Sequence, residues 1–471
     1  MVKKVLLVGD NPTIVGGVTN YTRALFEEFT KRESIEVYYL YSSHRVDADN
    51  SFFKKTRLVN EDIRLYKIGN SKNLEKNYDH LQLDIESPFN DRQFEKALDI
   101  ILPDVIHIHE MIGFSVNIVH LAKKRGIKVI KTIHEYWWLC PHRVMIDYNR
   151  RICDGPSDIV KCTKCVKNRS SSFDSSRTHL TQKLQRDFPA LINLYKRFKN
   201  SGTKEGGATP ENLSFNNLDI QLEEGDVVLK ESLTRRLKAT IEALNACDLL
   251  IGVSQDVKDT LMRFGVLEDR ILVQHIGSLI GANPIHHVKP VEPNDIVIGY
   301  IGGITYYKGV HQLVEAYLQL PDEFRAISRL EIYGKWSDGY YEGIKVQFSK
   351  HSDFKEKINF HGRFVPHDLP EITNTMDISV LPSLCADTAP QTIFESFSSG
   401  LPIIAPNVGG FPDFVKDGVN GLLYEKANVE SLRFQMQKII ERPVLLEEFK
   451  RNIPHIKSIS SNADELISLY Q

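Results

Sequence analysis

The stretch LPSLCADTAPQTIFE, residues 381–395, joins a short apolar run to a segment of helical period. Asp387 stands in the loop, where a carboxylate at the carboxyl end of a strand faces the crevice in which α/β sheets bind ligands. Glu395 follows inside the expected helix, where a carboxylate can accept two hydrogen bonds from a vicinal diol such as that of a ribose. A solvated helix face explains Glu395 equally well by spacing alone, but it explains the loop less well.

Apolar runs rich in Val and Ile alternate with helical segments throughout the chain, which is the pattern of βαβ units with buried parallel strands. A chain of 471 residues is long enough for two such domains, each with its own core. The predicted strands are 5–8, 36–41, 105–109, 128–133, 249–253 and 271–275 in a first series, and 296–301, 329–333, 357–361, 378–381, 402–405 and 421–424 in a second. The predicted helices include 18–29, 310–320 and 391–399.

The border between the two domains falls in a Pro-containing stretch without periodicity. We therefore predict a first domain over 1–284, a linker over 285–294, a second domain over 295–450 and a C-terminal segment over 451–471. Within the first domain we predict a cysteine-rich insertion at 140–165 and a flexible insertion at about 200–224, where hydrophobicity is low.

Charge and composition exclude several classes of protein. The 59 basic and 61 acidic side chains give a net charge of -2, whereas a nucleic-acid binder relies on a large basic surplus. The N-terminus lacks the apolar run of a signal peptide, and no apolar stretch approaches the ~20 residues of a spanning helix. We expect a cytoplasmic protein. A basic amphipathic segment at 183–199, interrupted by Pro189, leaves two alternatives open: peripheral contact with the inner face of the cell membrane, or packing on its own domain.

Two glycine-containing loops precede predicted helices. Gly16 and Gly17 would let backbone N–H groups approach an anion at a helix N-terminus, although a plain tight turn explains them as well. In the second domain, Gly303 and Lys308 stand in the loop after the strand 296–301. A lysine at the mouth of a helix can meet a phosphate, and a surface lysine is the alternative reading of Lys308.

A set of motifs in fixed order makes the second domain resemble the donor domain of the family 4 retaining nucleotide-sugar glycosyltransferases, which have the GT-B fold. These motifs are KGV at 308–310, LPS at 381–383, the acidic pair of 387 and 395, SGLPIIA at 399–405, VGGFPD at 408–413 and KDGVNGLLY at 416–424. The first domain resembles the acceptor half through GGV at 16–18, DVIHIH at 104–109, TIHE at 132–135 and GVS at 252–254. The resemblance implies two Rossmann-like, doubly wound domains that face each other across a cleft, with a C-terminal helix that crosses back to the first domain.

The resemblance also implies substrates and residue roles. The donor would be a nucleotide-diphosphate sugar and the acceptor a glycan or a lipid-linked molecule, with no catalytic metal. The implied catalytic residues are His134 at the sugar ring, Asp387 beside the transferred sugar and Lys308 at the diphosphate, while Glu395 would bind the ribose. Without the resemblance, His134 reads as a satisfied histidine at a strand end. The donor-binding candidates are Gly16, Gly17, Gly303, Lys308, Arg363, Thr388, Ala389, Pro390, Gln391, Thr392 and Glu395.

Two positions depart from the family pattern. The family usually has Glu where this chain has Asp387, and often Arg where it has Gly303. A missing arginine removes a charged hydrogen bond, which is worth ~1.5–3 kcal/mol, and Arg363 is a candidate to replace it. No residue is an obvious covalent nucleophile. We therefore expect attack on the same face as the departing phosphate, whose charge Lys308 and two helix N-termini would stabilise.

Four of the six cysteines fall within 26 residues, namely Cys140, Cys153, Cys162 and Cys165. Four thiolates can close a tetrahedral zinc site, and the last two have the spacing of one ligand pair. We expect a structural zinc that pins the loop after His134. Because Cys140 and Cys153 are widely spaced, His142 or an ordered turn could substitute for one ligand. Unliganded thiols and an iron–sulfur or redox role are the alternatives.

Three classes of function remain. The leading one is retaining transfer of a hexose-type sugar in surface polysaccharide or glycolipid biosynthesis. The second is a GT-B enzyme that does not transfer to an acceptor, such as a nucleotide-sugar epimerase. The third is a non-catalytic protein that binds nucleotide sugars. The pattern from Lys308 to Glu395 favours transfer, while Gly303 and Asp387 keep the non-catalytic class open.

Overall fold

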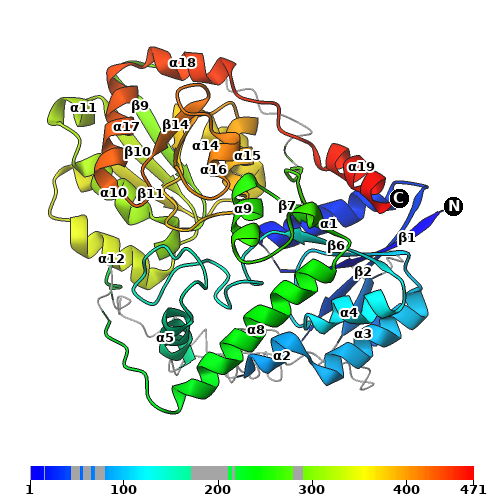
Figure 1. Ribbon diagram of the computed structural model, residues 1–471. Coiled ribbons are helices and arrows are strands. Elements are labelled where there is room, and N and C mark those ends of the chain that lie inside the picture. Colours follow the sequence, from blue (N-terminus) through cyan, green and yellow to red (C-terminus); the bar gives the residue numbers. More distant parts are fainter. Residues whose placement is uncertain are drawn as a thin grey trace, which may run out of the picture.

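The computed structural model describes residues 2–14, 16–43, 53–56, 65–68, 80–170, 210–214, 218–278, 280 and 290–471. Within these residues the chain forms two sheets, each with helices packed against it (Figure 1). The amphipathic segment 183–199, residues 200–209 and 215–217 of the predicted flexible insertion, and residues 285–289 of the predicted linker lie outside the described residues.

The first sheet has the strand order β3-β4-β2-β1-β5-β6-β7-β8 and is parallel except for the antiparallel pair of β3 and β4. Its strands are β1 (Lys3–Val8), β2 (Ile35–Ser42), β3 (Phe53–Thr56), β4 (Leu65–Ile68), β5 (Val105–Ile108), β6 (Lys128–Ile133), β7 (Leu249–Gly252) and β8 (Ile271–Val273). Every predicted strand of the first series is confirmed. The pair of β3 and β4 was not predicted, because both strands are four residues long and β3 reads FKKT.

The helices of the first domain are α1 (Gly17–Thr30), α2 (Gln82–Ile85), α3 (Pro88–Ile101), α4 (Asn117–Lys124), α5 (Ile159–Ser170), α8 (Asp226–Ala246) and α9 (Gln255–Arg263). The apolar face that the sequence predicts for α1 is buried, including Leu25 and Phe29. Helix α3 packs against α4, and α8 packs against α2, α4 and α5. The first domain is therefore a Rossmann-like sheet with helical layers.

The second sheet is wholly parallel, in the order β11-β10-β9-β12-β13-β14. Its strands are β9 (Ile296–Ile301), β10 (Ser328–Tyr333), β11 (Ile358–Gly362), β12 (Ile378–Val380), β13 (Ile403–Pro406) and β14 (Gly421–Tyr424), which confirms the predicted second series. All six residues of β9 are buried. Gly299 in this strand is required by packing, because a Cβ there would lie 2.0 Å from the sulfur of Met376.

Helices cover the second sheet and continue to the end of the chain. They are α10 (Val310–Leu318), α11 (Asp322–Ala326), α12 (Asp338–Phe348), α13 (Asp353–Glu356), α14 (Leu369–Thr373), α15 (Gln391–Ser398), α16 (Phe411–Phe414), α17 (Val429–Glu441), α18 (Val444–Arg451) and α19 (Ile459–Tyr470). Helices α10 and α17 pack against each other. Among the described helices, none is long and apolar enough to cross a membrane.

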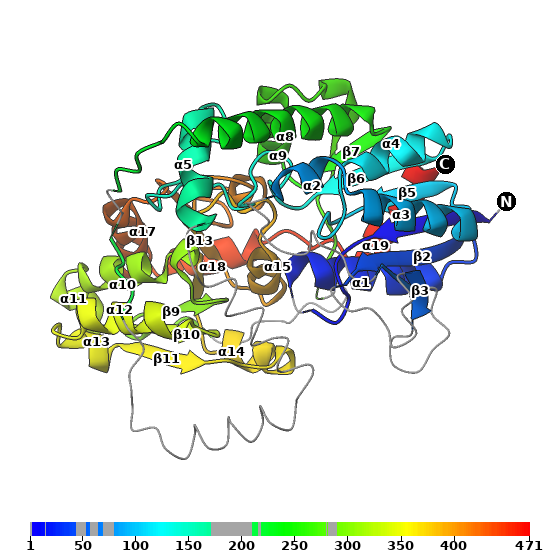
Figure 2. The ribbon, with the colours of Figure 1, turned by 90° about the horizontal axis from the view of Figure 1, so that it is seen from below.

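Helix α19 lies beside α1 in the first domain, although the elements directly before it in the chain, β9 to α18, belong to the second domain (Figures 1 and 2). The hydroxyl of Tyr470 lies 2.7 Å from Nδ1 of His107, at the centre of the first sheet. Asn462 Oδ1 accepts hydrogen bonds from the hydroxyl of Tyr21 at 2.7 Å and from the amide of Gly277 at 3.0 Å. Helix α19 is thus joined by hydrogen bonds to α1 and to the residues that follow β8.

The two domains share hydrophobic packing. Phe394, Phe397 and Phe411 of the second domain belong to the same buried cluster as the core of the first. In the other direction, Leu213, which precedes α8 in the chain, is buried in the core of the second domain. The two domains are therefore packed against each other through buried apolar side chains.

Candidate active site

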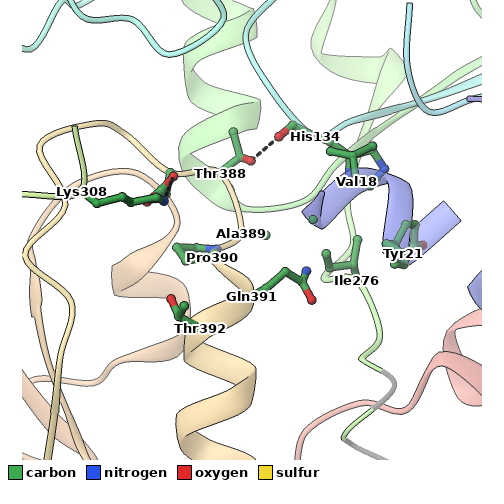
Figure 3. A pocket seen from close by; sticks show the side chains of 12 residues that line it. Val18, Tyr21, His134, Ile276, Lys308, Thr388, Ala389, Pro390, Gln391 and Thr392 are labelled. Carbon is green, nitrogen blue, oxygen red and sulfur yellow. Dashed lines mark hydrogen bonds and ion pairs between the residues drawn. The ribbon is translucent and has the colours of Figure 1, made fainter. Parts of the chain in front are cut away.

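A pocket of about 280 Å³ lies between the two domains, at the carboxyl ends of both sheets (Figure 3). Figure 3 shows Val18, Tyr21 and His134 on one side and Lys308 on the other, with the start of α15 between them. The lining residues are Gly17, Val18, Tyr21, His134 and Ile276 from the first domain, and Lys308, Asp387, Thr388, Ala389, Pro390, Gln391 and Thr392 from the second. Nine of these twelve lining residues, all except Val18, Tyr21 and Ile276, are candidates named from the sequence.

Lys308 and Asp387 form a two-pronged ion pair inside this pocket. The Nζ atom lies 2.8 Å from Oδ2 and 3.0 Å from Oδ1. Burial alone would lower the pKa of Lys308, but the adjacent Asp387 carboxylate outweighs it and raises the pKa, so the ammonium stays charged. Asp387 is itself supported by the hydroxyl of Ser383, which donates to Oδ2 at 2.8 Å.

The turn that carries Lys308 is pressed against the loop that carries Asp387. A short 3-10 helix, η4 (Tyr306–Lys308), ends at Gly309, whose φ of 70° is left-handed. A Cβ at Gly309 would lie 1.8 Å from the carbonyl oxygen of Pro382, so only glycine allows this approach. The amide of Leu384 donates to the carbonyl oxygen of Tyr307 at 2.8 Å and closes the contact. The local sequence thereby places the lysine beside the carboxylate.

Two helix N-termini meet at the pocket. Helix α15 starts at Gln391, directly after Pro390, and α1 starts at Gly17. A Cβ on Gly17 would lie 3.5 Å from Cγ of Gln391, so the two helix starts are in near contact. The first N–H groups of a helix have no partner within the helix, and its dipole favours negative charge. Together with Lys308, this arrangement can hold a bound anion.

His134 lies on the opposite wall and is buried, with 9% of its surface exposed. Its Nε2 lies 3.1 Å from Nδ1 of His109, and its ring packs 5.1 Å from that of Tyr21. Burial lowers the pKa of His134 well below the ordinary value, with smaller contributions from Lys131 and His107, so the ring is neutral. The backbone carbonyl of His134 accepts a hydrogen bond from the Thr388 hydroxyl at 2.6 Å (Figure 3).

A smaller pocket of about 40 Å³ adjoins the first and shares Lys308, Asp387 and Thr392 with it. Gly303 lines this pocket, and a Cβ built there would meet no heavy atom within 4 Å, so the position has room for a larger group. Glu395 and Arg363 are not among the residues that line these two pockets. Glu395 lies in α15 where burial raises its pKa, and Arg363 is exposed after β11.

The four clustered cysteines do not support the predicted zinc site. All four are free, and among the described residues no three or more His, Cys, Asp or Glu side chains are grouped so that they could hold a metal ion. Burial, with the neighbouring cysteines, raises the pKa of Cys162 and Cys165 to about 12, so without a bound ion both side chains are thiols at neutral pH. The thiol of Cys153 instead donates to the carbonyl oxygen of Gly155 at 3.6 Å.

Sequence reasoning missed several residues of the pocket. Val18, Tyr21 and Ile276 line it, but Val18 and Tyr21 were predicted only as part of a helix, and Ile276 was not singled out. Ser383 and Cys385 support Asp387 from below, with the Cys385 thiol 3.4 Å from Oδ1. The signal that the sequence offered for Tyr21 was its hydroxyl, a polar group on the otherwise apolar face of the predicted helix.

Part of the chain matches a known protein family. Residues 283–455 match the family described as "Glycosyl transferases group 1". Among curated proteins, the chain is 23% identical over 266 residues to D-inositol 3-phosphate glycosyltransferase of Rhodococcus opacus, covering 54% of this chain and 59% of that protein. It is 26% identical over 148 residues to 2-deoxystreptamine glucosyltransferase of Streptomyces kanamyceticus, covering 31% of this chain and 37% of that protein. The chain therefore spans about half the length, or less, of several curated relatives that it matches.

Solved structures match over nearly the full chain. HepE of Anabaena in complex with UDP superposes with a TM-score of 0.61 at 14% identity, covering 99% of each chain. Sucrose-phosphate synthase of Thermosynechococcus elongatus superposes with a TM-score of 0.63 at 14% identity, covering 99% of this chain and 98% of that one. The predicted fold class is confirmed: the chain has two Rossmann-like domains with parallel sheets and the GT-B fold of these structures, and residues 283–455 match the glycosyl transferases group 1 family.

Proposed function

We propose that this protein is a retaining glycosyltransferase that moves a hexose-type sugar from a nucleotide-diphosphate sugar to a glycan or lipid-linked acceptor in surface polysaccharide or glycolipid biosynthesis. The observation that carries the proposal is the meeting of Lys308, Asp387 and two helix N-termini in one pocket between the domains. The HepE complexes with UDP and with UDP-glucose support a nucleotide sugar as the donor, because they share the fold.

The donor diphosphate would lie between Lys308 and the first amides of α15, at Gln391 and Thr392. Both groups favour negative charge, and they are fixed by the fold before the reaction begins. Ala389 and Pro390 would form the floor under the sugar. Glu395, one turn inside α15, would accept hydrogen bonds from the ribose hydroxyls, with Gly303 and Arg363 at the edge of the donor site.

In the transfer step, the bond between the anomeric carbon and the diphosphate oxygen breaks, and the electron pair stays on the leaving phosphate. The acceptor oxygen bonds to the anomeric carbon on the same face, and its proton passes to the departing phosphate oxygen. Lys308 balances the charge that develops on this oxygen. The neutral ring of His134 would hydrogen-bond to a sugar hydroxyl, and Asp387 would hold Lys308 in position.

We place this reaction in the cytoplasm, with peripheral contact to the inner face of the membrane through the basic segment 183–199 when the acceptor is lipid-linked. Flotation with vesicles that contain anionic lipid, compared with neutral vesicles, measures this contact. A chain that lacks 183–199 is the control. Equal flotation of both chains would exclude this segment as the contact, and no flotation of the full chain would remove the membrane from the proposal.

The decisive experiment incubates the protein with a panel of UDP-, GDP- and ADP-linked hexoses and measures release of the nucleoside diphosphate, with and without an added glycan or lipid-linked sugar. Transfer with the α or β configuration of the donor preserved, read by NMR, supports the proposal. Epimerised donor without transfer assigns the protein to the epimerase class. Binding of nucleotide sugar without turnover assigns it to the non-catalytic class. Absence of both binding and turnover across the panel overturns the proposed function.

A further inference from the structure

The loop between β6 and α5 contains a short hairpin, residues 146–152. Ile146 and Ile152 form an isolated antiparallel bridge, and the side chain of Asp147 accepts hydrogen bonds from the amides of Asn149 and Arg151 at 2.8 and 2.9 Å. Arg150 stands at the tip with a left-handed φ of 63°. We refer to residues 146–152 as the tip hairpin. Its backbone is fixed by its own hydrogen bonds, so Arg150 has a defined direction.

Arg150 reaches across to the second domain. Its guanidinium carbon lies 4.5 Å from the centre of the Tyr306 ring, and Nη2 lies 2.7 Å from Oε1 of Glu211. Nη1 donates to the backbone carbonyl of Asn212. A planar guanidinium can stack on an aromatic ring and donate along its edge at the same time, which a lysine ammonium cannot. Three partners therefore hold one side chain, of which only 25% is exposed.

The partners of Arg150 are anchored on the second domain. The amide of Glu211 donates to the carbonyl oxygen of Gly339, at the start of α12, at 2.8 Å. Leu213 is buried in the core of the second domain. Residues 211–213 and Tyr306 therefore form one surface of that domain, and Arg150 is the residue of the first domain that inserts between them.

Tyr306 connects this surface to the active site. It is the first residue of η4, and Lys308 is the last, so the ring and the ammonium project from the same single turn. The Tyr306 ring stacks on His311 with a centre distance of 5.1 Å and an angle of 22°. Burial, with a smaller contribution from Arg150, lowers the pKa of His311 to about 4, so the ring beneath Tyr306 is uncharged at neutral pH. Tyr306 thus contacts both Arg150 and His311.

We propose that Arg150 is a positioning residue for Lys308: the tip hairpin of the acceptor-side domain clamps the turn Tyr306–Lys308 of the donor-side domain and fixes the lysine beside Asp387. The inference rests on the proposed function and adds to it a coupling between the two domains. Because Arg150 belongs to the opposite domain, the position of the diphosphate-binding lysine depends on the relative position of the two domains. The cysteine-bearing loop thereby contributes to donor binding without contacting the donor.

The first test needs no substrate. Hydrogen exchange is measured on the peptide that covers residues 304–310 in the wild-type chain and in Arg150→Ala, with Arg151→Ala as the matched control on the same hairpin. We expect exchange in this peptide to be at least five-fold faster in Arg150→Ala and unchanged in Arg151→Ala. Equal rates of hydrogen exchange in this peptide in all three proteins overturn the proposal, whatever the activity of the protein is. Circular dichroism confirms the fold, and Arg150→Gln replaces the alanine variant if that variant does not fold.

The second test separates positioning from a general structural role. With the donor that the panel identifies, we expect Arg150→Ala to lower kcat/KM for the donor by ten-fold or more, while KM for the acceptor changes by less than two-fold. Tyr306→Leu should have a similar effect, and the double variant should be no worse than Tyr306→Leu alone, because Arg150 acts through that ring. Effects that multiply in the double variant overturn the proposal. If no nucleotide sugar is bound or turned over, the proposed function fails, while the exchange experiment still decides on the clamp.

Discussion

The hydroxyl of Thr388, in the second domain, donates a hydrogen bond of 2.6 Å to the backbone carbonyl oxygen of His134, in the first. This bond crosses the pocket between the two sheets, and both groups are buried. It closes the site at the point where α15 begins, and it therefore ties the geometry of the donor loop to the relative position of the domains.

Thr388→Val removes this bond and leaves the shape of the side chain almost unchanged. A neutral hydrogen bond contributes about 1 kcal/mol, which corresponds to a change of about five-fold in the closed population. We expect the apparent KM for the donor to rise by about this factor. Thr388→Ser keeps the hydroxyl and is the control; equal KM values for the two variants would show that the bond does not hold the domains closed.

Lys308→Ala should lower turnover by about 10²–10³-fold, because it removes the positive charge that faces the leaving diphosphate. The fold should be kept, since the amine lies at the pocket and not in the core. Lys335→Ala, at an exposed lysine in the loop after β10, is the matched control and should retain wild-type turnover. Steady-state kinetics measure both, and wild-type turnover in Lys308→Ala would contradict the assignment of this residue.

Glu395→Gln should stabilise the protein at neutral pH and weaken nucleotide binding. Burial raises the pKa of Glu395, so the folded state binds its proton more tightly than the unfolded chain does. Wild-type stability therefore falls as pH rises from the ordinary glutamate pKa through the raised one, and the glutamine variant lacks this loss. Urea unfolding at pH 5 and pH 8 measures it, with the exposed Glu371→Gln as the control. An equal stability difference at both pH values would exclude this cause.

Tyr470→Phe should destabilise the first domain by about 1–3 kcal/mol, because it leaves a buried ring nitrogen of His107 without its partner. Burial lowers the pKa of His107 to about 3, so the histidine does not escape this cost by taking up a proton at neutral pH. Chemical unfolding followed by tryptophan fluorescence is suited to this measurement, since Trp137 and Trp138 lie in the first domain. Tyr341→Phe, on α12 of the second domain, should leave that transition in place.

Most of the fold could be predicted from the sequence, since buried parallel strands such as β9 are continuous apolar runs that no other element resembles. The same rule failed at β3, where Lys54 and Lys55 give no apolar signal and the strand exists only because β4 pairs with it. Edge strands of this kind are specified by their neighbour and not by their own composition.

Individual residues of the site could be predicted from the sequence, but the contacts between them could not. The glycines and Lys308 followed from loop positions, but the contact of Lys308 with Asp387, 79 residues away, depends on the close approach at Gly309. The zinc site predicted from the spacing of Cys162 and Cys165 finds no support, since no three or more metal-ligating side chains of the described residues are grouped around a site for an ion. Arg150 gave no signal in the sequence, because its role depends on a turn and on a segment of the chain that packs on the other domain.

The return of α19 to the first domain has a consequence for synthesis on the ribosome. Strands β1 to β8 emerge before β9, yet Tyr470, the residue before the last, supplies the partner of His107 and packs against Phe29 of α1. Domains usually fold in the order in which they are synthesised. Here the sheet of the second domain and its helices are synthesised before α19 can pack on the first domain, so the packing around His107 and Phe29 has to wait until the second domain has been made.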